Sequence, residues 1–411
     1  MTSTQYPAPS TGSSTSTVLP VNASSVLLDG ELTTVSSYTT TINGNGGIAY
    51  LTATDNSATI TVSGTAYSVP VNTVVASKAF GSSTSVTVTA NFSSTAPSTF
   101  TASTMPSNSA WSAVTYGLVG TTPTYVAVQG SGSTTAGAYS TNGTTWTSST
   151  MPSSPVWYGV TYGNGYFVAV ANSTTAGAYS TNGTTWTAST MPSSAYWYGV
   201  TYGLVGTTPT YVAVQGSGTT AGAYSTNGTS WTASTMPSSA YWQNVTYGNG
   251  YFVAVAQGPT TAGAYSTNGT TWTASTMPSS SQWYGVTYGL VGTTPTYVAV
   301  QGSGTTAGAY STNGTTWTAS TMPSSSNWQG VTYGNGYFVA VQASGTTAGA
   351  YSTNGTTWTA STMPSSSNWY GVTYGNGYFV AVTYGPTGAY FAQSLLLPVN
   401  FGIYAGPTTI N

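Results

Sequence analysis

A repeat with spacings of 40, 45, 41, 45 and 41 residues constrains this chain more than any other feature. The heptapeptide Ser-Thr-Asn-Gly-Thr-(Thr/Ser)-Trp occurs six times in 411 residues, and the phrases Val-Thr-Tyr-Gly and Tyr-(Phe)-Val-Ala-Val each occur seven times. A period of this length indicates one supersecondary unit that cannot bury its apolar face alone and therefore packs against copies of itself.

Each unit has the pattern of four short strands. In the second unit we expect them at residues 157–162, 166–170, 177–180 and 184–189, because Val, Tyr, Phe, Trp and Thr dominate these segments and Gly, Asn or Pro bound them. The Asn-Gly pair between the third and fourth segments is typical of a tight hairpin turn. Four strands in a unit of this length are typical of a β-propeller blade.

The two ends of the repeat array complement each other. The seventh unit stops after its third strand, near Tyr390, whereas residues 98–106 match the fourth strand at 184–192, with Phe100 in place of Trp. We therefore expect Phe100 and Tyr390 to meet where the first and last strands close a ring, which removes exposed sheet edges. The predicted fold is all-β, a seven-bladed propeller of four-stranded blades at residues 98–393.

The remaining residues have a different composition. Residues 1–17 are rich in Ser, Thr and Pro and predict an extended arm, and residues 18–97 alternate in strand fashion and predict a small β-sandwich-like anchoring domain. Closure of the ring brings residue 98 beside residue 393. The tail, residues 394–411, is therefore expected to pack on the N-terminal domain.

The near absence of charge limits the chemistry of the chain. Its charged residues are Asp29, Glu31, Asp55 and Lys78, and it has no His and no Cys. Residues 79–411 therefore offer only tyrosines for general acid–base chemistry. A Ser–His–Asp triad, a thiol nucleophile and the usual metal ligands are missing from them. One Lys is too few for nucleic-acid binding. We therefore expect no enzyme activity, no cofactor, no metal and no nucleic-acid partner.

The heptapeptide resembles the Asp-box of bacterial sialidase-type propellers, usually written Ser-x-Asp-x-Gly-x-Thr-Trp. Each box here is one residue shorter, and Asn replaces Asp. The resemblance implies a turn between the third and fourth strands of a blade, but the sialidase activity would need Arg, Glu and Asp, which residues 98–393 lack. The boxes are expected to be structural hairpin locks, and Asn-Gly-Thr is alternatively a glycosylation acceptor. The box asparagines are Asn142, Asn182, Asn227, Asn268, Asn313 and Asn354.

The residues on either side of the Trp in each first strand differ between units that are otherwise nearly identical. Drift at exposed positions and ligand binding both account for this variation. Aromatic rings beside amide and hydroxyl groups suit uncharged sugars. The candidate ligand-binding residues are Tyr196, Tyr198, Tyr241, Gln243, Tyr284 and Tyr370.

A structural role follows from the exclusions. The N-terminus lacks the pattern of a secretory signal, and the apolar runs are too short to cross a membrane. We expect a surface protein of a virion, a bacteriophage decoration or fibre, anchored to itself or other structural proteins through residues 1–97 and 394–411. The alternatives are a carbohydrate-binding adhesin, viral or cellular, that contacts host-surface glycans, and a subunit of an extracellular filament or cell-surface layer.

Overall fold

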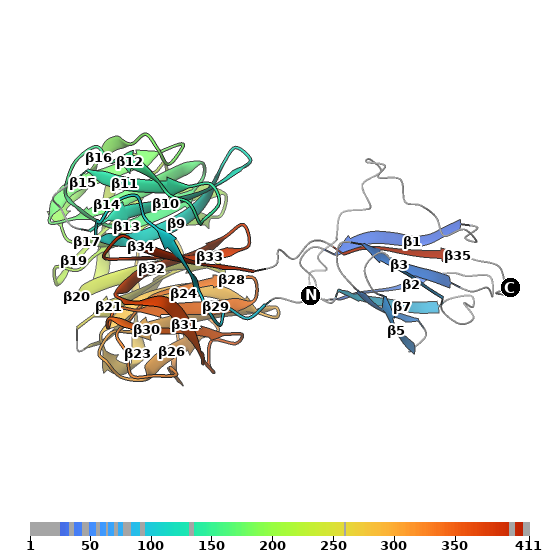
Figure 1. The fold of residues 1–411 in the computed structure, drawn as a ribbon. Helices are drawn as coiled ribbons and strands as arrows, with labels where there is room; N and C mark the ends of the chain where they lie inside the picture. Colours follow the sequence, from blue (N-terminus) through green and yellow to red (C-terminus); the bar gives the residue numbers. More distant parts are fainter. Residues whose placement is uncertain are drawn as a thin grey trace. The chain divides into compact units, whose positions relative to one another are not determined.

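The computed structural model describes residues 25–32, 37–42, 49–54, 58–62, 65–69, 73–76, 84–90, 95–130, 135–258, 260–393 and 399–405. All of their regular elements are β-strands (Figure 1). The chain divides into two compact units, Thr95–Gln393 and a smaller unit that combines Met1–Ser94 with Ser394–Asn411. The predicted arm at residues 1–17 lies outside the described residues.

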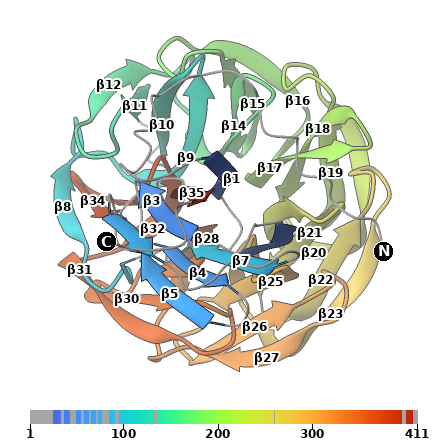
Figure 2. The same ribbon diagram turned by 90° about the vertical axis from the view of Figure 1, so that its right-hand side faces the viewer.

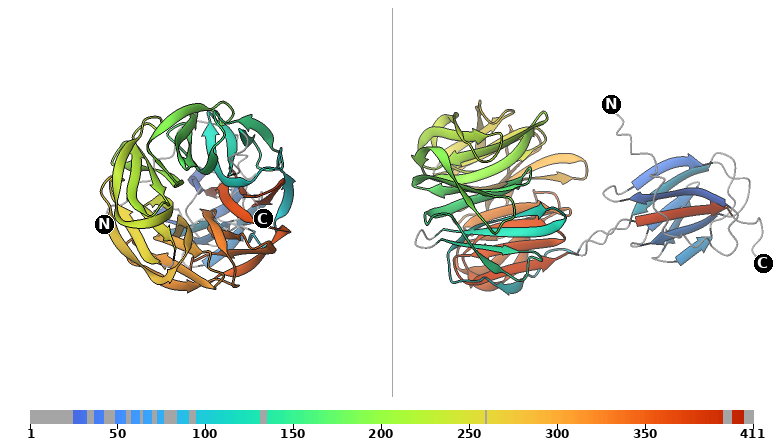
Figure 3. Two further views of the ribbon diagram at one scale, coloured as in Figure 1. Left: turned by 90° about the vertical axis from the view of Figure 1, so that its left-hand side faces the viewer. Right: turned by 90° about the horizontal axis from the view of Figure 1, so that it is seen from above.

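The larger unit is a β-propeller, viewed along its axis in Figure 2 and in the left panel of Figure 3. Its separate four-stranded antiparallel sheets have their strands in simple sequence order. These sheets are formed by β9 (Trp111–Val119), β10 (Thr122–Gln129), β11 (Ala136–Ser140) and β12 (Thr147–Thr150); β13 (Val156–Gly163), β14 (Tyr166–Asn172), β15 (Thr174–Ser180) and β16 (Thr187–Ala195); β24 (Trp283–Val291), β25 (Thr294–Gln301), β26 (Ala307–Ser311) and β27 (Thr318–Thr321); and β28 (Trp328–Gly334), β29 (Tyr337–Gln342), β30 (Thr346–Ser352) and β31 (Thr359–Ser367).

The ring closes through strands from both ends of the unit. The fifth separate sheet contains β32 (Trp369–Gly375), β33 (Tyr378–Thr383), β34 (Thr387–Ala392) and, at its outer edge, β8 (Thr101–Thr104). Tyr390 of β34 pairs with Thr101 of β8. The neighbouring Phe100 is 3% exposed, and its ring centroid lies 5.9 Å from that of Phe391. This is the strand arrangement that the two ends of the repeat predict.

The third and fourth repeat units do not form separate sheets. They share one seven-stranded sheet, which contains β17 (Trp197–Val205), β18 (Thr208–Gln215), β19 (Thr219–Ser225), β20 (Thr232–Gly248), β21 (Tyr251–Gln257), β22 (Thr260–Ser266) and β23 (Thr273–Ser281). The propeller with four-stranded blades is confirmed, but the prediction of seven such blades is corrected to five separate ones and this larger sheet.

A single pairing explains the joined sheet. The corner Met-Pro-Ser-Ser-Ala-Tyr-Trp is identical at residues 191–197 and 236–242. At the first corner the strand is interrupted at Tyr196. At the second, Tyr241 pairs with Gln257 of β21, so β20 continues through the corner. The first part of β20 pairs with β19 and the last part with β21.

Neighbouring units are held together by tyrosine rings that lie on glycines. A Cβ added at Gly163 would lie 2.0 Å from Cγ of Tyr202 in the next unit, so only glycine fits there. The same contact recurs at every junction and returns to the start of the ring. The pairs are Gly117–Tyr162, Gly163–Tyr202, Gly203–Tyr247, Gly248–Tyr288, Gly289–Tyr333, Gly334–Tyr374 and Gly375–Tyr116.

Each apolar core also joins two neighbouring units. Val126 and Val128 of β10 pack in one cluster with Trp157 and Phe167 of the following unit. The first-strand tryptophans are fully buried, and each indole N–H donates to a serine carbonyl four residues earlier, as from Trp197. Burial of such large rings supplies most of the apolar stabilisation.

The smaller unit contains two four-stranded antiparallel sheets. Leu51 of the first sheet and Ile60 and Val62 of the second are buried. The C-terminal strand β35 pairs with both β1 and β3, so the tail is part of this unit. The first sheet contains β1 (Ser25–Leu32), β35 (Val399–Ala405), β3 (Ala49–Thr54) and β6 (Thr73–Ala76), and the second contains β2 (Ser37–Ile42), β7 (Thr84–Ala90), β4 (Ala58–Val62) and β5 (Thr65–Val69).

Candidate functional site: the central cavity

The box side chains bond their own turns. In the second unit, Ser180 Oγ accepts hydrogen bonds from the backbone N–H groups of Asn182 and Gly183, at 3.2 and 2.8 Å. Asn182 Oδ1 accepts from the N–H groups of Thr184 and Thr185, at 3.0 and 2.9 Å. The other five boxes repeat this pattern. The boxes therefore hold hairpins, and their Ser and Asn oxygens are used within the turn.

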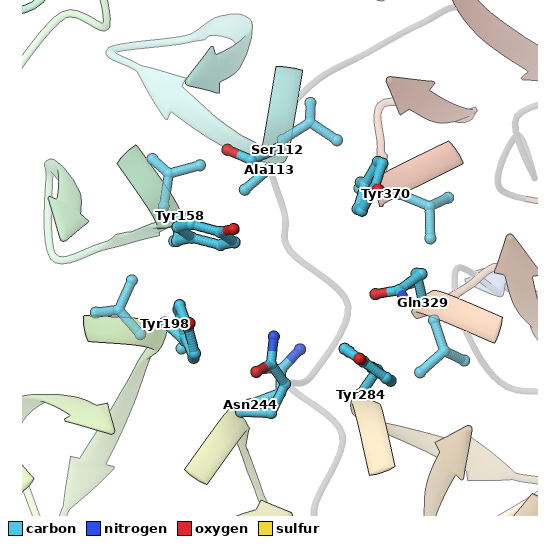
Figure 4. Close-up of a pocket in the computed structure, with 18 of the residues that line it drawn as sticks. Ser112, Ala113, Tyr158, Tyr198, Asn244, Tyr284, Gln329 and Tyr370 are labelled. Carbon is cyan, nitrogen blue, oxygen red and sulfur yellow. The ribbon is translucent and has the colours of Figure 1, made fainter. Parts of the chain in front are cut away.

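A cavity of about 450 Å³ lies at the centre of the ring, where the first strand of each unit begins (Figure 4). Binding sites for small molecules commonly have volumes of roughly 300–1,000 Å³. The residue that follows the first-strand Trp faces the cavity in every unit. These residues are Ser112, Tyr158, Tyr198, Gln243, Tyr284, Gln329 and Tyr370.

The wall of the cavity is built from close backbone contacts. A Cβ at Gly159 would lie 2.5 Å from the carbonyl oxygen of Tyr198, and one at Gly330 would lie 2.6 Å from that of Tyr370. Five units have glycine at this position, and Ala113 and Asn244 occupy it in the others. Because the inner strands approach so closely, the preceding side chains determine most of the chemistry of the cavity.

Tyrosine rings form two clusters on this wall. The ring centroids of Tyr158 and Tyr198 lie 4.7 Å apart. Those of Tyr370 and Tyr384 lie 3.8 Å apart, and the two rings are stacked at an interplanar angle of 17°. Tyr384 follows β33 and reaches the cavity from the end of the second strand. The cavity therefore offers both ring faces and phenolic hydroxyls.

Amide groups complete the lining. Gln257 Nε2 donates to the hydroxyl of Tyr284 at 2.7 Å. Asn244 Oδ1 accepts from the backbone N–H of Val245 at 2.8 Å. By contrast, Gln243 Oε1 is buried and has no hydrogen-bond partner among the described residues. An unpaired buried acceptor costs about 1–3 kcal/mol.

The cavity is electrically neutral at physiological pH. Burial, followed by the neighbouring Tyr158, Tyr196 and Tyr284, raises the pKa of Tyr198 to about 12. Burial also raises the pKa of Tyr284 and of Tyr370. No formally charged residue occurs after Lys78 in the sequence. The phenols therefore stay protonated and are available as hydrogen-bond donors.

A second hollow of about 340 Å³ adjoins the central cavity. Tyr198 and Gln257 line both spaces, and Tyr196 and Tyr241 line only the second. Tyr241 is 54% exposed and Tyr196 is 42% exposed, which places both among the most exposed large apolar side chains of the described residues.

The six candidate residues from the sequence divide between these spaces. Tyr198, Gln243, Tyr284 and Tyr370 line the central cavity, and Tyr196 and Tyr241 line the second. The candidate set omits six lining residues with polar side chains. Three of them, Ser112, Tyr158 and Gln329, follow the first-strand Trp and could have been found from that position. The other three are Asn244, Gln257 and Tyr384. Gln257 ends its second strand and Tyr384 follows one, and both lie beyond the repeated phrase.

Among the described residues, no group of three or more His, Cys, Asp or Glu lies close enough to hold a metal ion. No helix in this part of the chain is long and apolar enough to cross a membrane.

Comparison with known proteins shows the fold of the larger unit. No family model matches the chain, and no curated protein matches its sequence. Virginiamycin B lyase from Staphylococcus aureus matches with a TM-score of 0.61 and 12% identity, over 71% of this chain and 99% of that one. A streptogramin B lyase matches with a TM-score of 0.61 and 14% identity, over 71% and 98%. YCF48 bound to D1 peptide matches with a TM-score of 0.56 and 14% identity, over 73% and 96%.

These matches correct the expectation that the chain is not an enzyme. Virginiamycin B lyase is an enzyme with a similar propeller, so the fold does not support the exclusion. The expectation also relied on the lack of charged and thiol side chains. It left the tyrosine hydroxyls of the cavity as titratable groups. At 12 to 14% identity the likeness concerns the fold alone. These matches support a β-propeller fold, and they do not support a sialidase or phage identity.

Proposed function

We propose that the propeller binds an uncharged, hydroxyl-rich ligand, a carbohydrate, in the central cavity. One observation carries the proposal. The residue that follows the first-strand Trp changes between Ser, Tyr and Gln among units that are otherwise closely similar, and in every unit this residue lines the cavity. Drift at exposed loop positions accounts poorly for differences that converge on one cavity.

The chemistry of the lining supports a neutral sugar. Tyrosine faces suit the C–H faces of a sugar ring, and hydroxyl and amide groups suit its O–H groups. A charged ligand would meet no opposite charge here, because the propeller unit has no formally charged side chain.

The path of the chain supports display of this face. The two ends of the propeller unit meet, because Gln393 Nε2 donates to the carbonyl of Thr95 at 3.2 Å. The backbone N–H of Gln393 donates to Gly377, in the turn between the first and second strands of the last unit. That turn lies at the far end of the first strands from the cavity residues. The chain therefore enters and leaves on the face opposite the binding residues.

This arrangement favours an adhesin that is held through residues 1–97 and 394–411 and contacts host-surface glycans. A structural role in a virion, as a phage decoration or fibre, is the second candidate, supported by the same placement of both chain ends. For either role, we interpret the seven-stranded sheet as two blades joined through β20, so that the propeller has seven blades. We also interpret the boxes as Asn variants of the Asp-box.

An array of neutral glycans, followed by calorimetry with the soluble hit, tests the binding proposal. We expect Tyr198→Ala to weaken binding at least tenfold. Leu204→Ala is the matched control, because Leu204 is 46% exposed and lies at the turn end of its strand, away from the cavity. Tryptophan fluorescence would verify that both variants are folded. If no neutral glycan binds, or if both variants weaken binding equally, the proposal fails.

Fractionation of the native source on a density gradient distinguishes a virion protein from a cellular one. Co-sedimentation with nuclease-protected nucleic acid and a capsid protein would support the virion. Recovery with cell envelopes or with filaments free of nucleic acid would support the cellular alternatives.

A further inference from the structure

The second hollow is built by two neighbouring repeat units and by no others. The residue before the first-strand Trp is tyrosine only in the third and fourth units, as Tyr196 and Tyr241. The other units have Ala110, Val156, Gln282, Asn327 and Asn368 at this position. Strands β17 and β20, which these tyrosines precede or join, are neighbours in the ring. At this position the ring therefore has tyrosine in one sector only, the aromatic sector formed by Tyr196 and Tyr241.

Glycines support the rings of this sector. A Cβ at Gly216 would lie 2.3 Å from Cε2 of Tyr198, so the Tyr198 ring lies directly on the backbone. Gly258 has a φ of +105°, a conformation that side chains rarely adopt. A Cβ at Gly218 would lie 3.3 Å from Cζ of Tyr241. Small residues thus keep the surface beside the tyrosines open.

The two spaces are continuous through shared residues. Tyr198 and Gln257 line both the central cavity and the outer hollow. The rings of Tyr196 and Tyr198 are nearly parallel, at 20°, with centroids 6.4 Å apart. Tyr198 on the inner wall (Figure 4), Tyr196 and the exposed Tyr241 therefore line a path that leads from the central cavity into the outer hollow.

We propose that the ligand is a linear, neutral oligosaccharide with one end in the central cavity and the following residues on the outer platform formed by Tyr196 and Tyr241. This inference rests on the proposed carbohydrate binding and adds its length and direction. The platform offers ring faces with few fixed hydrogen-bond partners. It therefore contributes affinity with little selectivity, while the cavity selects the terminal residue.

Calorimetry with a length series tests the platform. The probes are the neutral glycan that binds most strongly on the array and its fragments, shortened from the end distant from the cavity to the terminal monosaccharide. We expect the affinity of the wild-type protein to rise at least tenfold from the monosaccharide to the trisaccharide. Tyr196→Ala and Tyr241→Ala, singly and together, should remove this increase, so that the trisaccharide binds no more tightly than the monosaccharide.

Asn327→Ala is the matched control, because Asn327 occupies the same position in the sixth unit, away from the aromatic sector. It should leave both the monosaccharide affinity and the length dependence unchanged. Affinity that does not depend on length, or a length dependence that survives in the double variant, overturns the platform while carbohydrate binding in the cavity stands. Absence of binding by every array glycan overturns both.

Discussion

Gly163→Ala is expected to loosen the contact between the second and third repeat units. The added Cβ would lie 2.0 Å from Cγ and 2.4 Å from Cδ1 and Cδ2 of Tyr202. Neither backbone is free to yield, because Gly163 pairs with Tyr166 and Tyr202 pairs with Tyr211 in the ladders. The Tyr202 ring must therefore leave its place on the glycine.

Overpacking of this kind costs about 1–3 kcal/mol of unfolding free energy, and contact with the ring base rather than a flexible tip favours the upper part of that range. Tyr202→Ala removes the obstacle. In that background, Gly163→Ala should cost much less than it does alone. The resulting coupling between the two substitutions should reach about 1–3 kcal/mol.

Denaturant unfolding followed by tryptophan fluorescence measures these changes. All 13 tryptophans lie between Trp111 and Trp369, so the signal reports on the propeller unit alone. Gly385→Ala is the control, because a Cβ there meets only Thr383 Oγ1, at 3.5 Å. The reasoning would be refuted if Gly163→Ala destabilised the unit no more than Gly385→Ala does, or if the effects of Gly163→Ala and Tyr202→Ala simply added.

Three further predictions concern the box, the ring closure and alkaline stability. Ser180→Ala should cost about 1–3 kcal/mol in the same unfolding assay, because it leaves the buried N–H of Gly183 unpaired; an equal loss in the exposed Thr185→Ala would contradict this. Phe100→Ala should cost about 3–5 kcal/mol, because Phe100 is 3% exposed in the closing blade; a loss below 1 kcal/mol would show that closure does not depend on this ring. Because the pKa of Tyr198 is raised from 10.0 to about 12, its contribution to stability should be complete below pH 10 and be lost as the pH rises through 12. Fluorescence-monitored unfolding across this range should show a shallower decline in Tyr198→Phe than in the wild-type protein, and an identical decline would refute the assignment.

Local patterns predicted the strands well and their ends less well. The first strand of the second unit was expected at 157–162, and β13 spans Val156–Gly163. The fourth was expected at 184–189, but β16 spans Thr187–Ala195. It begins later because Asn182 Oδ1 binds the N–H groups of Thr184 and Thr185, which therefore cannot join the ladder. That competition involves side chains and is invisible to strand propensity.

The candidate site shows the same limit. Comparison of the repeat units identified Tyr198 and Gln243 in the sequence, because the residue after the first-strand Trp differs between units that are otherwise nearly identical. Gln257 and Tyr384 could not be predicted, because they lie at or just after the ends of second strands and reach the cavity only when the ring is assembled. The joined sheet could not be predicted for a related reason. The corner sequences around Tyr196 and Tyr241 are identical, but only Tyr241 is paired as part of a continuous strand.

The sequence by itself determined the propeller, its four-stranded units and the strand that closes the ring. These features depend on alternation, turn residues and repetition, which act over a few residues or recur at a fixed period. Only the tertiary structure decided how side chains from seven units converge on one cavity and which of them form its aromatic sector. Those arrangements depend on contacts between residues far apart in the chain, such as the hydrogen bond from the hydroxyl of Tyr125 to the carbonyl of Gly375, 250 residues away. The geometry of such contacts is set by ring closure and close backbone packing, which no local pattern encodes.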